Sequence, residues 1–217
     1  MGSHSGGSPF RTNGLATSVT TAPDLSSNAM VAADARRRML KAALELAAQG
    51  GYEAVQVRHL SERAGVSSRT IYSHFSSLDS LLIVAVIEQA RPMYRSLADE
   101  PPEGLTPAER VDELISRLTA TISANRPITV ALVRALHSGK PDVAPYVRDF
   151  GSTIQGMFIA AIAPETPSER DLAAAAVLES VWFHAVVNWA TTPEPTIDPA
   201  ETMRRAVGTL FEPGSAG

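Results

Sequence analysis

The sequence predicts an all-α protein of about nine helices, and two observations carry this prediction. Apolar residues recur at three- and four-residue intervals along most of the chain, whereas no window alternates convincingly with the period of two that a half-buried strand requires. Candidate caps also recur, because Ser, Thr or Asp precedes most periodic segments and Gly or Pro ends several of them. With 217 residues the chain is long enough for one large domain or two small ones.

The first helix is expected to begin near Asp34 and to end at Gly50 and Gly51, which can act as a C-cap. Its apolar residues have helical spacing: Met39, Leu40, Ala43, Leu44 and Ala47. Residues 1–30 are rich in Ser, Gly, Thr and Ala without periodicity, which predicts a disordered arm. The starting letters M-G-S-H and the run S-N-A-M at 27–30 resemble vector-derived residues, which gives this arm a second interpretation.

Two short helices follow, expected at Val57–Ala64 and Ser68–Phe75, and Gly65 breaks the chain between them. Ser67 is well suited to be the N-cap of the second helix. Five apolar residues are spaced to share one buried face: Leu60, Ala64, Val66, Ile71 and Phe75. A short helix that keeps a polar outer face, and that a neighbouring helix holds across a Gly turn, fits the major groove of DNA.

Six longer helices account for the rest of the chain. Their expected ranges are Leu78 to about Leu97, Pro107 to about Asn125, Pro127 to about His137, Asp142 to Ala163, Glu169 to Ala190, and Pro199 to about Phe211. Ser77, Thr106, Ser168 and Asp198 are the expected caps of four of them. The elements together predict an arm over residues 1–30, a helix-turn-helix domain over 31–80 and a second helical domain over 81–217.

Several classes of function are disfavoured by what the sequence lacks. It contains no Cys, which excludes disulfides and thiolate metal sites and suits a reducing, cytoplasmic compartment. It contains no Gly-rich phosphate loop, no G-x-S-x-G and no H-E-x-x-H motif, so we expect neither an enzyme nor a cofactor or metal site. Glu179, His184 and Asn188 interrupt the most apolar stretch, 172–190, which therefore predicts a buried amphipathic helix and no membrane span.

The net charge of −4 is unevenly distributed along the chain. Residues 31–80 hold seven basic and five acidic residues, whereas residues 81–217 hold eleven basic and seventeen acidic residues. Such a distribution can steer the basic end towards phosphates and repel the other end. Arg36, Arg37 and Arg38 are either a solvated charge run or phosphate contacts.

The expected DNA contacts lie on the two short helices: Arg58, Ser67, Ser68, Arg69, Thr70, Tyr72, Ser73 and His74. Arg69 is the first candidate for reading guanine, because its guanidinium fork matches the O6 and N7 acceptors. The Ser and Thr hydroxyls suit base or phosphate contacts, and Arg58 is placed to touch the DNA backbone. The alternative is a surface helix whose polar side chains are merely solvated.

The first domain resembles the TetR family of bacterial transcriptional regulators. The matching segments are G-G-Y-E-A-V at 50–55, A-G-V-S at 64–67 and T-I-Y-S-H-F at 70–75, with the spacing to Leu78, Leu81 and Leu82. The resemblance implies a homodimer with a C-terminal ligand-binding domain, and it implies phosphate contacts for Tyr72 and His74. The sequence departs from the family pattern at Arg69, where Gly is frequent, and at Leu78, where many members carry a phosphate-binding Lys.

The second domain is similar to actinobacterial TetR-type repressors of steroid and cholesterol breakdown, through G-K-P-D-V at 139–143 and the helix containing E-S-V-W-F-H-A-V-V-N-W-A. The resemblance implies that large side chains line a ligand pocket: Met93, Tyr94, Met157, Phe158, Trp182 and Phe183. Arg134 and His137 are the candidate polar partners, although His137 can instead cap the carbonyls at its helix end. The alternative for the large side chains is ordinary core.

The last two helices are the expected homodimer interface, with Leu178, Val181, Ala185 and Trp189 at helical spacing. We therefore expect a repressor that holds a palindromic operator in double-stranded DNA until a small apolar inducer, such as a steroid or acyl thioester, binds. Two alternatives stay open at this point. One is an activator on the same fold, and the other is a ligand-binding or scaffold protein that has lost DNA binding.

Overall fold

A computed structural model describes residues 25–192 and 198–211 of the chain. Within these ranges the protein forms nine α-helices and no strand, which confirms the predicted fold class. The helices are α1 (Leu25–Ala54), α2 (Val57–Ala64), α3 (Ser68–His74), α4 (Leu78–Asp99), α5 (Pro107–Ser123), α6 (Arg126–Leu136), α7 (Ala144–Ile162), α8 (Glu169–Thr191) and α9 (Pro199–Phe211).

The first helix differs most from its expected bounds. It begins at Leu25, nine residues before Asp34, although residues 25–33 lack the apolar periodicity on which the prediction depended. The expected break at its other end is present, because Gly50 and Gly51 both leave helical geometry and Gly51 takes a φ of 64°. The first 24 residues of the predicted arm lie outside the described residues.

Four of the predicted helix caps are present. Ser77, Thr106 and Ser168 each accept a hydrogen bond from a backbone N–H in the first turn of the following helix, and each belongs to a reciprocal capping box. Asp198 accepts a hydrogen bond from the N–H of Ala200 at the start of α9. These local bonds explain why the sequence predicts the helix starts well.

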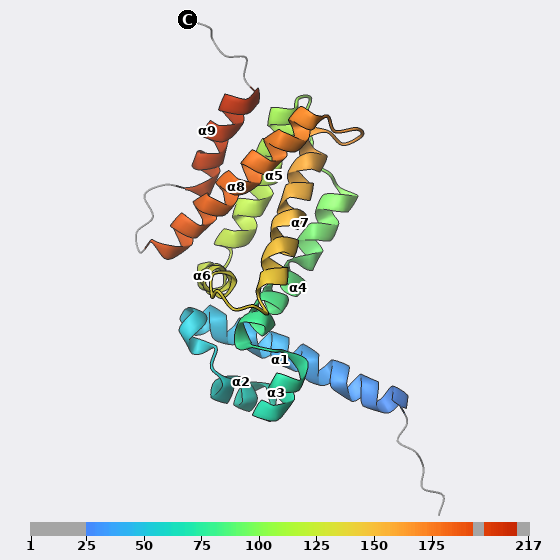
Figure 1. Cartoon of the computed structure of the whole chain (residues 1–217), viewed down its shortest axis with the longest axis vertical. Helices are drawn as coiled ribbons and strands as arrows, with labels where there is room; N and C mark the ends of the chain where they lie inside the picture. The colour runs from blue at the N-terminus through green and yellow to red at the C-terminus, as the bar shows by residue number, and fades with distance from the viewer. Residues whose placement is uncertain (1–24, 193–197, 212–217) are drawn as a thin grey trace, which may run out of the picture.

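Two hydrophobic cores organise the helices. Figure 1 shows α1, α2 and α3 at one end of the molecule and α5, α7, α8 and α9 at the other. The first core contains α1, α2, α3 and the N-terminal half of α4, and the second core contains α5, α7, α8 and α9. Helix α6 lies between the two ends of the molecule and packs on α1 and α4 through Ile128, Ala131 and Leu132. A helix of the second sequence half thus completes the core of the first, and α4 runs without interruption through the predicted boundary at residue 80.

Helix α8 is long and apolar enough to cross a membrane by length and composition, and the bent pair of α3 and α4 meets the same test if it is counted as one span. The inner side chains of α8, which include Leu178, Trp182 and Val186, form the second core with neighbouring helices. Only 28% of its most apolar window is buried in the chain, and Leu172 and Val177 are exposed. One face of α8 is thus buried in the second core, and the exposed face is partly apolar.

Candidate nucleic-acid interface and ligand cavity

The turn between α2 and α3 is fixed by Gly65. This residue has φ 63° and ψ 42°, the left-handed conformation that Gly adopts without strain, and its N–H donates to the carbonyl of Ser61. The guanidinium of Arg38 donates to the carbonyl of Ala64 at 2.6 Å. A Cβ on Gly65 would lie 3.1 Å from Nη1 of Arg38, so both backbone geometry and space favour glycine here.

Helix α3 packs on the first core through its apolar face and is capped at its N-terminus. Ile71 is fully buried and Phe75 is 6% exposed, as the apolar spacing predicts. Ser67 is the N-cap: its Oγ accepts from the N–H of Thr70 at 3.1 Å and lies 2.9 Å from the Thr70 hydroxyl. Ser73 donates to the carbonyl of Thr70 at 2.8 Å. The helix is therefore anchored on the core and capped, and the hydroxyls of Ser67, Thr70 and Ser73 are held by local hydrogen bonds.

The eight predicted DNA contacts all lie on α2, α3 or the turn between them. Six of them are exposed: Arg58, Ser67, Ser68, Arg69, Tyr72 and Ser73. Thr70 and His74 are half-buried. Arg58 forms an exposed ion pair with Glu62 at 3.1 Å, whereas the Arg69 guanidinium forms no hydrogen bond or ion pair with any described residue. Arg69 is free to meet an outside partner.

Arg36 and Arg38 of α1 contact the helix-turn-helix and the following helix α4. Arg36 forms an ion pair with Glu88 at 2.7 Å, and its guanidinium lies 5.5 Å from the centre of the Phe75 ring. Arg38 caps the end of α2, and Arg37 pairs with Asp34. These contacts lie within the chain, so two of the three arginines hold α1 against the unit that carries α3.

A cavity of about 370 Å³ lies between the two cores and is lined by residues of α4, α5, α6, α7 and α8. Four of the eight residues that the sequence singles out for ligand binding line it: Met93, Tyr94, Trp182 and Phe183. Most of the remaining wall is aliphatic and comes from α4, α5 and α6, as with Ile87, Ile122 and Leu132. No charged side chain of the described residues lines this cavity.

Most polar groups in the cavity wall already have partners inside the protein. The Thr129 hydroxyl donates to the carbonyl of Ile122 at 2.8 Å, and the Asn125 side chain accepts from the N–H of Ile128. The Tyr94 hydroxyl has no hydrogen-bond partner among the described residues, and burial raises the pKa of this phenol, so it stays a neutral donor. Tyr94 is the wall group best placed to recognise a polar atom of a ligand.

The other four predicted ligand residues do not line the cavity. Phe158 is fully buried in the second core, and Met157 packs against that core. Arg134 points to α1, where it pairs with Glu53 at 2.7 Å. Nδ1 of His137 lies 2.8 Å from the carbonyl of Val133, and its ring stacks on Phe183, so it caps its helix end, which is the alternative that the sequence left open.

The sequence did not point to the contribution of α5, and at α6 it pointed to Arg134 and His137 instead of the aliphatic residues that line the cavity. Ile122, Ile128 and Leu132 are ordinary aliphatic residues at helical spacing, and nothing in their type separates a cavity wall from a packed core. Asn125 and Thr129, which flank the start of α6, are the polar signal that a closer look could have used.

Comparison with known proteins supports both halves of this arrangement. Residues 39–85 match the family described as bacterial regulatory proteins, tetR family, and residues 104–210 match the family described as tetracyclin repressor-like, C-terminal domain. The HTH-type transcriptional repressor KstR of Rhodococcus jostii (strain RHA1) is 35% identical over 207 residues, which are 94% of this chain and 95% of that protein. KstR of Mycobacterium tuberculosis (strain H37Rv) is 30% identical over 81% of this chain and 80% of its own length.

Solved structures with the same fold include a TetR transcriptional regulator from Rhodococcus sp. RHA1, at a TM-score of 0.69 and 25% identity over 83% of this chain and 98% of that one. Thermus thermophilus FadR in complex with lauroyl-CoA has a TM-score of 0.64 and 19% identity, over 82% and 93% of the two chains. The relatives are named as transcriptional repressors or regulators, in agreement with the expectation that the chain is not an enzyme.

Proposed function

The chain belongs to the TetR family of bacterial regulatory proteins, and on that premise we propose that it is a cytoplasmic repressor released from operator DNA by a small apolar ligand. One observation carries the proposal. The exposed, capped helix α3 and a largely apolar cavity occur in one chain, and α6 both lines the cavity and packs on α1. A ligand that favours one arrangement of α6 therefore changes the population of DNA-binding states.

Helix α3 is the proposed recognition helix. Arg69 reads a guanine through O6 and N7, because its guanidinium is exposed and has no partner among the described residues. Tyr72, His74 and Arg58 contact phosphates and set the position of the helix in the major groove. Ser67, Ser68, Thr70 and Ser73 supply hydroxyls to base edges or phosphates.

The repressor is proposed to act as a homodimer that uses the outer faces of α8 and α9. Leu172 and Val177 are 42% and 48% exposed on α8, and this apolar surface is available for a partner chain to cover. The interface residues expected from the sequence need one correction: Leu178 and Ala185 face the chain's own core, at 0% and 6% exposure, and are not available to a partner. A two-fold dimer would place its two α3 helices roughly 34–36 Å apart on a palindromic operator.

The proposed ligand has an uncharged, largely apolar body. The cavity wall holds no charged side chain among the described residues, so an ionised group would lie inside it without a partner at a high cost. A steroid nucleus or the acyl chain of a thioester fits this chemistry, provided that any charged part stays outside. The FadR relatives of the same fold were solved with stearoyl-CoA and lauroyl-CoA, which supports the acyl alternative.

The proposal is tested by selecting duplexes that the protein retains from a genomic fragment pool and measuring their release. We expect a palindromic site whose affinity falls steeply with salt and whose complex dissociates when an apolar ligand raises the melting temperature. A protein that binds the apolar ligand but retains no duplex would instead be a ligand-binding or scaffold protein. Release by hydrophilic metabolites alone would contradict the proposed ligand class.

A further inference from the structure

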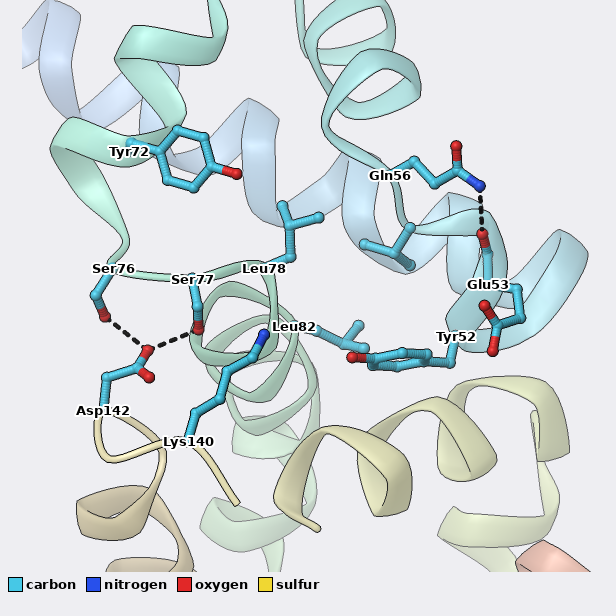
Figure 2. Close-up of a pocket in the computed structure, with 11 residues that line it drawn as sticks. Tyr52, Glu53, Gln56, Tyr72, Ser76, Ser77, Leu78, Leu82, Lys140 and Asp142 are labelled. Carbon is cyan, nitrogen blue, oxygen red and sulfur yellow. Dashed lines mark hydrogen bonds between the residues drawn. The ribbon is translucent and has the colours of Figure 1, made fainter. Parts of the chain in front are cut away.

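The segment G-K-P-D-V at 139–143 follows α6 directly and reaches the helix-turn-helix, and the proposed function leaves it without a role. Gly139 takes a φ of 71° and turns the chain after α6. The loop then places Lys140 and Asp142 against the start of α4 and the link that joins α4 to the recognition helix (Figure 2). Two separate polar contacts result.

The first contact joins Asp142 to the link between α3 and α4. Its Oδ2 accepts hydrogen bonds from the hydroxyls of Ser76 at 2.9 Å and Ser77 at 2.6 Å (Figure 2). These bonds lower the pKa of the Asp142 carboxyl, with the Ser77 hydroxyl as the larger cause, so the carboxylate stays ionised. Ser76 is two residues beyond the last residue of α3, and Ser77 is the N-cap of α4. The second domain therefore holds the recognition helix at its C-terminal end.

The second contact joins Lys140 to a buried carboxylate. Asp79, in the first turn of α4, is 0% exposed, and its Oδ1 accepts a hydrogen bond from the Tyr52 hydroxyl at 2.5 Å. Its Oδ2 accepts no hydrogen bond from the described residues, but Nζ of Lys140 lies 2.5 Å away as an ion pair. Removing the ammonium would leave a buried carboxylate without its counter-ion, which a folded protein tolerates poorly.

The space around these contacts is hollow. A pocket of about 490 Å³ lies between the loop, the C-terminal end of α1 and the start of α4, and Tyr52, Tyr72, Leu78 and Lys140 are among its walls. Lys140 and Asp142 are held beside this hollow by polar contacts, whereas Val143, at the end of the segment, is 1% exposed and packs in the first core. Polar contacts of this kind are made or lost by small displacements, whereas a packed interface resists them.

The loop is also coupled to the ligand cavity through α6. Ile128, Leu132 and Leu136 of α6 face the cavity, and Leu136 is separated from Lys140 by only the turn at residues 137–139. A displacement of α6 by a ligand would therefore reach the loop with little chain between to absorb it. The displaced loop would then shift Asp79, in the first turn of α4, through Lys140, and it would shift Ser76 and Ser77, in the link between α3 and α4, through Asp142.

From this geometry we infer that Lys140 and Asp142 are positioning residues, which fix the recognition helix in its operator-binding orientation and release it when a ligand displaces α6. The inference rests on the proposed function. It assigns no DNA contact to either residue, because both act through Asp79 and the Ser76–Ser77 link. Arg134 of α6 offers the contrast: it pairs with Glu53 of α1, but both side chains are largely exposed, so the pair contributes little.

The test compares Lys140→Met, Asp142→Ala and the control Arg134→Gln in the full chain. The oligomeric state and the melting temperature of each variant are measured first, to establish that it folds and forms the dimer. Operator and scrambled duplexes are titrated by fluorescence anisotropy at one salt concentration. Lys140→Met and Asp142→Ala are expected to lose at least about tenfold in operator affinity and much less on scrambled DNA, whereas Arg134→Gln stays within about twofold. Lys140→Arg keeps the charge and should restore most of the operator affinity.

The charges make the comparison decisive. Lys140→Met and Arg134→Gln each remove one positive charge, whereas Asp142→Ala removes a negative one. A general electrostatic effect on DNA affinity would therefore not weaken both loop variants, Lys140→Met and Asp142→Ala, and spare the control Arg134→Gln. Operator affinity that is unchanged in both loop variants, or that falls equally on operator and scrambled DNA, would overturn the inference while leaving the proposed function standing. An unaltered protein that binds no operator would refute the proposed function itself.

Discussion

The helix-turn-helix end of the molecule and the cavity between its two cores are built in contrasting ways. At the first, Ile71 and Phe75 anchor α3 on the core, Ser67 caps it, and Arg38 closes the preceding turn, so the position of the helix backbone is defined. At the second, helices of both cores leave about 370 Å³ unfilled. Packed interiors rarely leave such a space, so the cavity is a place where stability is given up.

The contrast explains how one chain can both read DNA and respond to a small molecule. Sequence reading requires a rigid helix, because a misplaced guanidinium cannot contact both guanine acceptors. A response requires an element with more than one arrangement, and α6 is the element proposed for this role because it borders the cavity on one side and α1 on the other. The rigid part and the adjustable part meet at α6 and its following loop.

The largest expected effect comes from the outer face of α8. Val177→Glu places a charge on the exposed surface of α8 that we propose as the interface, which should convert the dimer into monomers and abolish tight operator binding, because a monomer reaches one half-site. Sedimentation and anisotropy measure the two outcomes. Leu105→Glu is the matched control, since Leu105 is 96% exposed and lies outside α8. A Val177→Glu protein that remains dimeric would place the interface elsewhere.

The next largest effect separates the packed core from the cavity wall. Phe158→Ala empties a fully buried site and should lower the free energy of unfolding by about 3–5 kcal/mol. Phe183→Ala makes the same change in the half-exposed cavity wall, where part of the ring has no packed neighbour, and should cost clearly less. Urea unfolding measures both. Equal losses would mean that the cavity is not a real difference between the two sites.

A smaller effect is expected at the unpaired phenol of the cavity. Tyr94→Phe should weaken binding of decan-2-one by about 0.5–1.5 kcal/mol, the usual value of one neutral hydrogen bond, and leave binding of decane unchanged. Trp182 lines the cavity and reports entry by its fluorescence, and Trp189→Phe removes the other Trp. Equal weakening for ketone and alkane would assign Tyr94 a packing role in place of a polar one.

The smallest effect appears only at high pH. Burial and the hydrogen bond to Asp79 raise the pKa of Tyr52 to about 12 from the ordinary 10.0. Because the folded state holds this proton more tightly than the unfolded state, the stabilisation is complete below pH 10 and is lost as the pH rises to about 12. Ultraviolet titration should show one phenol near 12 that Tyr52→Phe removes. A Tyr52→Phe protein that retains every late-titrating phenol would contradict this assignment.

The same contrast separates what the sequence predicts from what it does not. The bounds of α2 and the start of α3 follow from Gly65 and Ser67, signals that act within a few residues, and the structure confirms them. The cavity is different, since Phe158 and Trp182 are both large aromatic residues on apolar helices. Both belong to the second core, but only Trp182 also borders the cavity, because the packing of the helices decides the direction of each side chain.

Buried charge is the other feature that the sequence leaves out of reach. Asp79 looks like an ordinary first-turn acid of a helix, and its burial depends on Tyr52 and on Lys140, which is 61 positions away. Similarly, Arg134 was expected near a ligand, but it finds Glu53 on α1 because α6 crosses that helix. Such pairings depend on the tertiary arrangement and leave no local pattern.

Arg69 is proposed to read operator sequence from α3, and a comparison with Arg58 separates base reading from phosphate contact. Affinities of the unaltered protein, Arg69→Ala and Arg58→Ala for a selected operator and for a scrambled duplex are compared by anisotropy at one salt concentration. Arg69→Ala should lose about 1–3 kcal/mol on the operator, far less on the scrambled duplex, and should relax the preference at one base pair. The affinity of Arg58→Ala should fall by the same factor for both duplexes. An equal fall for Arg69→Ala on both duplexes would make Arg69 a phosphate contact and would contradict this proposal.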